Sequence, residues 1–160
     1  MNTIIDGHNL IAKIPGLSLS MADDEQRLVT LLNLYGEFER GKLEVYFDGA
    51  PAGQAGSQNF GRVRAHYITQ SQPADYAIIA RLLKLGKAAR TWRVVTSDHR
   101  VQAAAREVHA QVIRSEDFAP QLLGAIQSQR RQTEKSRYRP LSPSEVDEWL
   151  AVFKIHQKPK

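Results

Sequence analysis

The 160-residue chain contains no cysteine, only two tryptophans and two methionines, and no long run of apolar residues. Without cysteine it can form no disulfide bond, no thiolate metal site and no cysteine nucleophile, so any metal would be bound by oxygen. The missing apolar run excludes a membrane-spanning helix, which needs about 20 such residues. The N-terminus has neither the basic nor the apolar region of a signal peptide. The length fits one domain, and we expect a cytoplasmic protein.

The formal net charge of +5 is concentrated near the C-terminus. Residues 130–160 carry eight Lys or Arg and four Asp or Glu, whereas residues 1–129 are nearly neutral. A basic tail indicates a polyanionic partner, with RNA or DNA ahead of a membrane, because no amphipathic apolar face accompanies the charge. A solvated tail that keeps the protein soluble explains the charge equally well.

Short apolar runs alternate with helical patterns along the chain, which predicts an α/β fold with a mainly parallel sheet and helices on both faces. Strands are expected at 2–5, 43–47, 63–68, 92–96 and 111–113, and helices at 21–40, 74–89, 99–108 and 115–129. Residues 50–61, rich in glycine and small polar side chains, are expected to form a flexible loop.

The C-terminal part is expected to be organised differently from the rest. We predict a folded domain over residues 1–129, and a basic linker with a short C-terminal helix over residues 130–160. The linker, residues 130–139, has five basic residues and no apolar periodicity. Ser142, Pro143 and Glu145 then form the sequence pattern of a capping box with proline at the first helical position.

Four aspartates follow apolar strand-like runs or open a helix: Asp6, Asp48, Asp75 and Asp98. Each has a simple structural explanation on its own, because Asp48 can belong to a turn, Asp75 can be a helix N-terminal charge and Asp98 can be an N-cap. Parallel strands end on the same edge of a sheet, however, so the four together predict one acidic crevice. Gathered carboxylates repel one another and call for a cation, Mg²⁺ or Mn²⁺.

A divalent cation bound by carboxylates suits hydrolysis of phosphodiester bonds, because it polarises the phosphate and lowers the pKa of the attacking water. Residues that contact the ligands, and not the cation itself, would orient the carboxylates, the water or the phosphate. The predicted residues are the catalytic metal ligands Asp6, Asp75 and Asp98, with Asp48 as a supporting ligand and Asn9, Thr96 and Ser97 as orienting residues. The histidines lack the spacing of a zinc site, and His8 is interpreted as an ordinary loop residue.

The segments IIDGHNL, VYFDGA, PAD and VVTSDHRVQAAAREVHAQVIRSEDF resemble, in this order, the NYN domain, particularly its YacP-like branch within the PIN-like nucleases. The resemblance covers about residues 1–128. It implies a PIN-like three-layer fold, with the first and fourth strands adjacent in the sheet, and a metal-dependent ribonuclease active on single-stranded or ribosome-associated RNA. The positions that match the family's motifs are Asp6, Asn9, Asp48, Asp75 and Asp98.

Two positions depart from this pattern. Many relatives carry further acids directly after the aspartate of the PAD motif and one turn later, where this chain has Tyr76 and Ile79. Fewer carboxylates would hold a second metal weakly, so one-metal catalysis and a non-catalytic RNA-binding or ribosome-associated adaptor both stay open. A Rossmann-like or flavodoxin-like ligand-binding domain is less well supported, because no glycine-rich phosphate loop follows the first strand.

Basic and aromatic residues outside the crevice are candidates for contact with RNA. Alternation places Arg62, Arg64 and His66 on one face of a strand expected near the edge of the sheet, where they can equally form its solvated side. The complete predicted RNA-binding set is Arg62, Arg64, His66, Arg100, Arg130, Arg131, Arg137, Tyr138 and Arg139.

Overall fold

The computed structural model describes residues 1–137 and 142–156, so that Tyr138 and Arg139 of the predicted RNA-binding set lie outside the described residues. Contacts between residues divide the chain into two compact units, Met1–Ile126 and Gln127–Lys160. In the described part of the chain, no helix is both long and apolar enough to cross a membrane.

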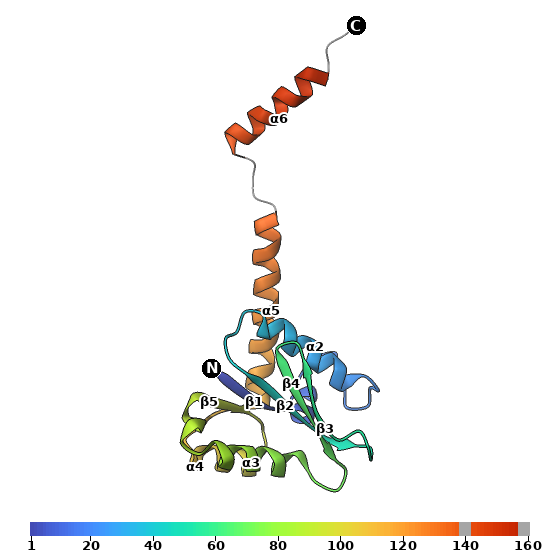
Figure 1. The fold of residues 1–160 in the computed structure, drawn as a ribbon, viewed down its shortest axis with the longest axis vertical. Helices are drawn as coiled ribbons and strands as arrows, with labels where there is room; N and C mark the ends of the chain where they lie inside the picture. Colours follow the sequence, from blue (N-terminus) through green and yellow to red (C-terminus); the bar gives the residue numbers. More distant parts are fainter. Residues whose placement is uncertain (138–141, 157–160) are drawn as a thin grey trace. The chain divides into compact units, whose positions relative to one another are not determined.

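Among the described residues, six strands form one sheet in the first unit, in the order β3-β4-β2-β1-β5-β6 (Figure 1). The strands are β1 (Asn2–Asp6), β2 (Leu43–Ala50), β3 (Gly56–Phe60), β4 (Val63–Thr69), β5 (Trp92–Val95) and β6 (Gln111–Ile113). All neighbouring strands are parallel except β3 and β4. Strand β1 pairs with β2 and with β5, so the first and fourth strands predicted from the sequence are adjacent, as the family resemblance implies.

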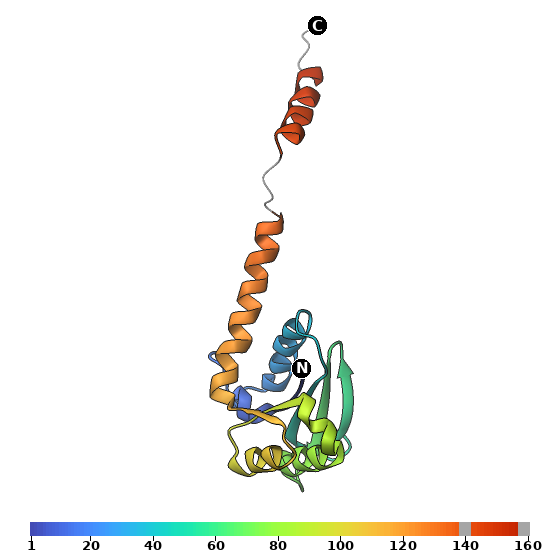
Figure 2. The same ribbon diagram turned by 90° about the vertical axis from the view of Figure 1, so that its left-hand side faces the viewer.

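Helices cover both faces of this sheet (Figures 1 and 2). They are α1 (Gly7–Ile11), α2 (Asp24–Gly36), α3 (Ala74–Leu85), the 3₁₀ helix η1 (Gly86–Thr91), α4 (His99–Glu107) and the first part of α5 (Ser115–Arg137). A further helix, α6 (Pro143–His156), belongs to the second unit. Helices α1, α2 and the first part of α5 pack against one face, and α3 and α4 pack against the other. The predicted three-layer α/β fold is confirmed.

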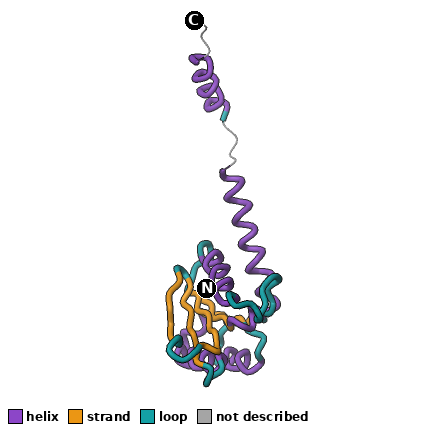
Figure 3. Tube along the Cα trace, turned by 90° about the vertical axis from the view of Figure 1, so that its right-hand side faces the viewer, coloured by secondary structure: helices purple, strands orange, loops and turns teal. Residues whose placement is uncertain are grey.

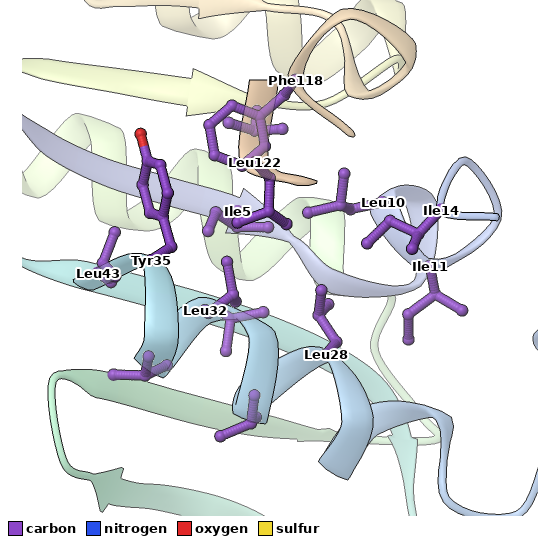
Figure 4. Packing of buried hydrophobic residues seen from close by; sticks show 14 of the residues in the cluster. Ile5, Leu10, Ile11, Ile14, Leu28, Leu32, Tyr35, Leu43, Phe118 and Leu122 are labelled. Carbon is purple, nitrogen blue, oxygen red and sulfur yellow. The ribbon is translucent and has the colours of Figure 1, made fainter. Parts of the chain in front are cut away.

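The larger hydrophobic core lies between the sheet and helices α1, α2 and α5 (Figure 4). Ile5 of β1 contributes to it, as do Leu28 and Leu32 of α2 and Phe118 of α5, and all four are fully buried. Each such side chain stabilises the fold by about 1.5–3 kcal/mol relative to an exposed position. This packing fixes β1, and therefore the aspartate at its end, against α2 and α5.

The segment 50–61, expected to be a flexible loop, contains strand β3. It pairs with β4 in an antiparallel hairpin, and the turn between them contains Gly61 at φ 58°. Strand β3 is therefore the edge strand, and β4 lies one position further in. The sequence did not predict β3 because its residues are mainly polar and exposed, and it is held by backbone pairing rather than by an apolar face.

Helix α1 begins directly after β1, in a segment expected to be a loop. Gly7 makes this possible, since a Cβ there would lie 2.3 Å from the ring of Phe47. The first turn of α1 therefore approaches β2 more closely than any other residue type would allow.

Helix α5 continues to Arg137, beyond its predicted end at residue 129, so the segment predicted as a linker is helical over residues 130–137 (Figure 3). Gln, Arg, Lys and Glu are good helix formers, and the missing apolar periodicity means only that this part of the helix has no buried face. The predicted capping box is confirmed. Ser142 Oγ accepts from the Glu145 amide at 3.3 Å, and Glu145 Oε2 accepts from the Ser142 amide at 2.7 Å.

Candidate functional site

Acidic residues lie at the carboxyl ends of three neighbouring parallel strands. Asp6 ends β1, Asp48 lies near the end of β2, and Asp98 follows β5. Because β1 lies between β2 and β5, the ends of these strands meet at one edge of the sheet, which we call the acidic edge. The charges of Asp48 and Asp98 both act on the carboxyl group of Asp6. The fold thus brings three of the four predicted aspartates together.

Asp6 has a strongly perturbed carboxyl group. Burial is the main cause, and together with the negative charges of Asp48 and Asp98 it raises the pKa of Asp6 from 3.8 to about 6. A hydrogen bond from Thr96 Oγ1 to Asp6 Oδ2, at 3.2 Å, partly opposes this rise. A desolvated carboxylate beside two others is an environment that a bound cation would relieve.

Thr96 connects Asp6 to Asp98. Its hydroxyl donates to Asp6 and accepts from the backbone amide of Asp98 at 3.0 Å. The side chain of Asp98 in turn accepts from the amides of Arg100 and Val101, at 2.8 and 3.0 Å, and caps helix α4. Asp98 is therefore the N-cap that its sequence position allowed, and it is also an electrostatic neighbour of Asp6.

A second chain of hydrogen bonds runs from α1 to the start of α5. Asn9 Oδ1 accepts from the Ser97 amide at 2.8 Å and from Ser115 Oγ at 2.6 Å. Ser97 Oγ donates to Glu116 Oε2 at 2.8 Å. Asn9 and Ser97 thus hold the loop after β5 in place. Ser115 and Glu116 were not predicted from the sequence, although the residues SED, one position after the last strand, carried the same signal as the other strand ends.

His8 bridges two carboxylates, and its interpretation as an ordinary loop residue is wrong. Its Nδ1 lies 2.7 Å from Asp48 Oδ1, and its Nε2 lies 2.9 Å from Glu25 Oε1. The carboxylate of Asp48 thus already has a side-chain partner within the protein. Glu25 was not singled out, because its partner His8 lies 17 positions away in the sequence.

Asp75 lies in the first turn of α3 and is paired with Arg100. Its Oδ2 is 3.7 Å from Arg100 Nη1, and the Arg100 guanidinium lies 5.0 Å from the centroid of the Tyr76 ring. Tyr76 first, and then Asp75 and Asp98, raise the pKa of Arg100. A protein cation therefore acts on both Asp75 and Asp98. Ile79, the second departure from the family pattern, packs against the core formed with α3 and α4.

Within residues 1–137 and 142–156, no three His, Asp or Glu side chains are grouped so as to hold a metal ion. The oxygen ligands of Asp6 and Asp98 are nevertheless of the type that Mg²⁺ and Mn²⁺ prefer. Mg²⁺ often takes only one or two carboxylates and completes its shell with water and substrate phosphate. The acidic edge is chemically suited to supply such a partial shell.

A hollow of about 430 Å³ adjoins the acidic edge. Glu25 and Tyr67 line it, together with residues of the connection between β2 and β3. The ring of Tyr67 stacks on Phe47, with centroids 5.6 Å apart. The volume of the hollow lies in the range of small-molecule binding sites and is large enough for a nucleotide.

Within the first unit, the predicted RNA-binding residues do not gather in one place. Arg100 lies at the acidic edge, whereas Arg62 and Arg64 lie at the amino end of β4, which is the opposite edge of the sheet. Arg130, Arg131 and Arg137 are exposed on α5, in the second unit.

His66 of the same set faces protein atoms. Its ring stacks on Tyr46 with centroids 4.4 Å apart, and Nδ1 lies 2.7 Å from Ser57 Oγ. Its Nε2 is buried and has no hydrogen-bond partner among the described residues. Burial lowers the pKa of His66, mainly by desolvation.

Comparison with known proteins gives one family and one solved fold. The model of the YacP-like NYN domain matches residues 3–153. The crystal structure of Rae1 (YacP) from Bacillus subtilis superposes with a TM-score of 0.71 at 21% identity, and the match covers 96% of this chain and 92% of that one. A crystal structure of a single-residue mutant of Rae1 gives a TM-score of 0.70 at 20% identity, over 92% and 89% of the two chains. No curated protein sequence matches significantly.

Proposed function

The chain belongs to the YacP-like NYN domain family, a family of nuclease-like domains, and we propose that it is a metal-dependent endoribonuclease. It would hydrolyse phosphodiester bonds of single-stranded or ribosome-associated RNA in the cytoplasm, with Mg²⁺ or Mn²⁺ as its cofactor. One observation carries the proposal. The buried carboxyl group of Asp6, with a pKa raised to about 6, stands beside Asp48 and Asp98 at the ends of adjacent strands.

The proposed roles follow from the contacts of each residue. Asp6 and Asp98 would supply carboxylate oxygens to the cation, and the phosphate of the RNA and water would supply the rest. Thr96, which is hydrogen-bonded to both residues, would hold their relative positions. When bound, the cation would polarise the phosphate and lower the pKa of the attacking water.

Asp48 and Asp75 have supporting roles in this proposal. Each already has a side-chain partner within the protein, His8 and Arg100 respectively. They would add negative potential to the acidic edge rather than bind the metal directly. Arg100 is exposed and lies beside Asp75, so it would contact a phosphate oxygen of the bound RNA.

The direct test is cleavage of a single-stranded RNA by the full chain in Mn²⁺. Asp6→Asn should abolish cleavage while the far-ultraviolet circular dichroism spectrum stays unchanged. Asp23→Asn is the matched control, because Asp23 is exposed and, among the described residues, forms its ion pair with Arg27 of α2. Equal cleavage by wild type, Asp6→Asn and Asp23→Asn would overturn the proposed role of the acidic edge.

A second function, a non-catalytic RNA-binding or ribosome-associated adaptor, is favoured by one observation. No three acidic or histidine side chains of the described residues are grouped for a metal ion, and two of the predicted ligands, Asp48 and Asp75, already have side-chain partners within the protein. An adaptor would retard RNA or ribosomal subunits on a gel and yield no products in Mn²⁺. Truncation before Arg130 should weaken that retardation, because it removes most of the net positive charge.

A further inference from the structure

A second hollow lies at the amino ends of the parallel strands, whereas the acidic edge lies at their carboxyl ends. It has a volume of about 500 Å³ and opens between the amino ends of β2 and β4, the β3–β4 turn and α3. Four basic side chains and one acidic side chain line it: Lys42, Arg62, Arg64, Arg81 and Glu44. Asp48 lies four positions after Glu44 on β2, which corresponds to about 13 Å along the strand. This basic hollow is therefore distinct from the acidic edge.

The single acidic residue of the basic hollow, Glu44, is hydrogen-bonded to neighbouring side chains. Glu44 is buried and accepts two hydrogen bonds from Arg81, at 3.0 and 2.8 Å, and one from the Tyr46 hydroxyl at 3.3 Å. Arg81 also lies over the ring of Trp92, 5.3 Å from its centroid. Because both carboxylate oxygens of Glu44 accept from Arg81, Glu44 does not neutralise the other three cations of the hollow.

Arg62 is held in position by the protein. Its Nε donates to the Gly36 carbonyl at 3.0 Å, and its backbone amide donates to Asn33 Oδ1 at 2.9 Å. Two glycines make this approach possible. A Cβ on Gly36 would lie 2.9 Å from Arg62 Cβ, and a Cβ on Gly61 would lie 2.9 Å from Asn33 Oδ1. The terminal guanidinium nitrogens of Arg62 form no hydrogen bond or salt bridge within the described residues.

Lys42 and Arg64 complete the hollow from β2 and β4. Both are exposed, and in the described part of the chain neither side chain forms a hydrogen bond or a salt bridge. Three unneutralised cations around one concavity match the geometry and charge of phosphate oxygens. No aromatic side chain lines the hollow, so it offers no surface on which a base could stack.

We propose that the basic hollow is a second phosphate-binding site, which binds the backbone of an RNA strand without reading its bases. Contacts to phosphate position a nucleic acid and carry no sequence information. That the hollow binds phosphate is inferred from its own basic residues, whereas the identification of the ligand as RNA rests on the proposed function. A site at this distance from Asp6 would hold a part of the RNA away from the cleaved bond.

The test is the affinity of the full chain for a fluorescent single-stranded RNA in EDTA, where cleavage does not occur. Lys42→Gln/Arg64→Gln should weaken binding roughly tenfold at low salt and reduce the slope of log affinity against log salt by about 1.4, which corresponds to two lost phosphate contacts. The matched control is Lys87→Gln/Arg90→Gln, which removes the same two charges at exposed positions of η1. Thermal melting verifies that both variants are folded.

Each outcome decides between specific alternatives. If the hollow variant and the control bind RNA equally, and neither differs from wild type in binding ATP or inorganic phosphate, the proposal is overturned. If only ATP or phosphate binding is lost, the site takes free nucleotide phosphates and the assignment to RNA is wrong. Asp6→Asn separates this proposal from the proposed function, because it should lose cleavage in Mn²⁺ and, in EDTA, keep the contribution of the basic hollow to RNA binding.

Discussion

The raised pKa of Asp6 predicts that removing its charge stabilises the folded protein. The carboxyl group binds a proton more tightly in the folded state, with a pKa of about 6, than at its ordinary value of 3.8. The stability that Asp6 contributes as a neutral acid is therefore fully present below pH 3.8 and is lost as the pH rises through 6. At neutral pH without a metal, the ionised carboxylate destabilises the fold.

The magnitude follows from the two pKa values. Linkage gives a cost of about 3 kcal/mol at pH 7.5 and about 1.6 kcal/mol at pH 5. Asp6→Asn removes this cost and keeps an oxygen that can accept the hydrogen bond from Thr96. We therefore expect the variant to be more stable by up to about 3 kcal/mol at pH 7.5, and by about half as much at pH 5.

Urea denaturation in EDTA at the two pH values measures the difference. Asp23→Asn serves again as the control and should give no gain, because the Asp23 carboxylate is exposed and its pairing with Arg27 lowers its pKa. An Asp6→Asn variant that is less stable than wild type at pH 7.5, or equally stabilised at both pH values, would refute the electrostatic reasoning. Stabilisation together with lost cleavage would identify Asp6 as a residue kept for function at the expense of stability.

Three further predictions concern residues around the acidic edge and the basic hollow. Asp98→Ala removes the N-cap of α4 and should cost about 1 kcal/mol in a thermal melt, whereas Asp98→Asn keeps the cap; equal stability of the two would contradict the capping role. Gly7→Ala places a methyl group against Phe47 and should cost about 1–3 kcal/mol, so an unchanged melting temperature would mean that β2 yields easily. Glu44→Gln leaves Arg81 without its buried partner and should cost about 3 kcal/mol in urea denaturation; a neutral effect would show that the pair contributes nothing to stability.

The acidic edge was largely predictable from the sequence, because short apolar runs mark where strands end. The positions of Asp6, Asp48 and Asp98 needed only the rule that parallel strands end on one edge. The pairing of His8 with Asp48 was not predictable, since a contact across 40 positions leaves no local pattern. The pairing of Asp75 with Arg100 depends in the same way on how α3 and α4 pack together.

The fold was predicted best where burial imposes a pattern. Strands β1, β2 and β5 are buried, and their apolar runs indicated them within a few residues. Strand β3 and the end of α5 were not predicted, because both are polar and exposed. Such segments depend on backbone pairing or on helix propensity, and these leave weaker signals than a hydrophobic face.

We propose that the acidic edge and the RNA phosphate together bind a divalent cation. Electron paramagnetic resonance of Mn²⁺, titrated into the protein with and without a non-cleavable single-stranded RNA, tests this most directly. We predict weak Mn²⁺ binding to the protein alone, markedly tighter binding with RNA, and loss of that gain in Asp6→Asn. Mn²⁺ binding that RNA does not change, or that Asp6→Asn retains in full, would contradict the account.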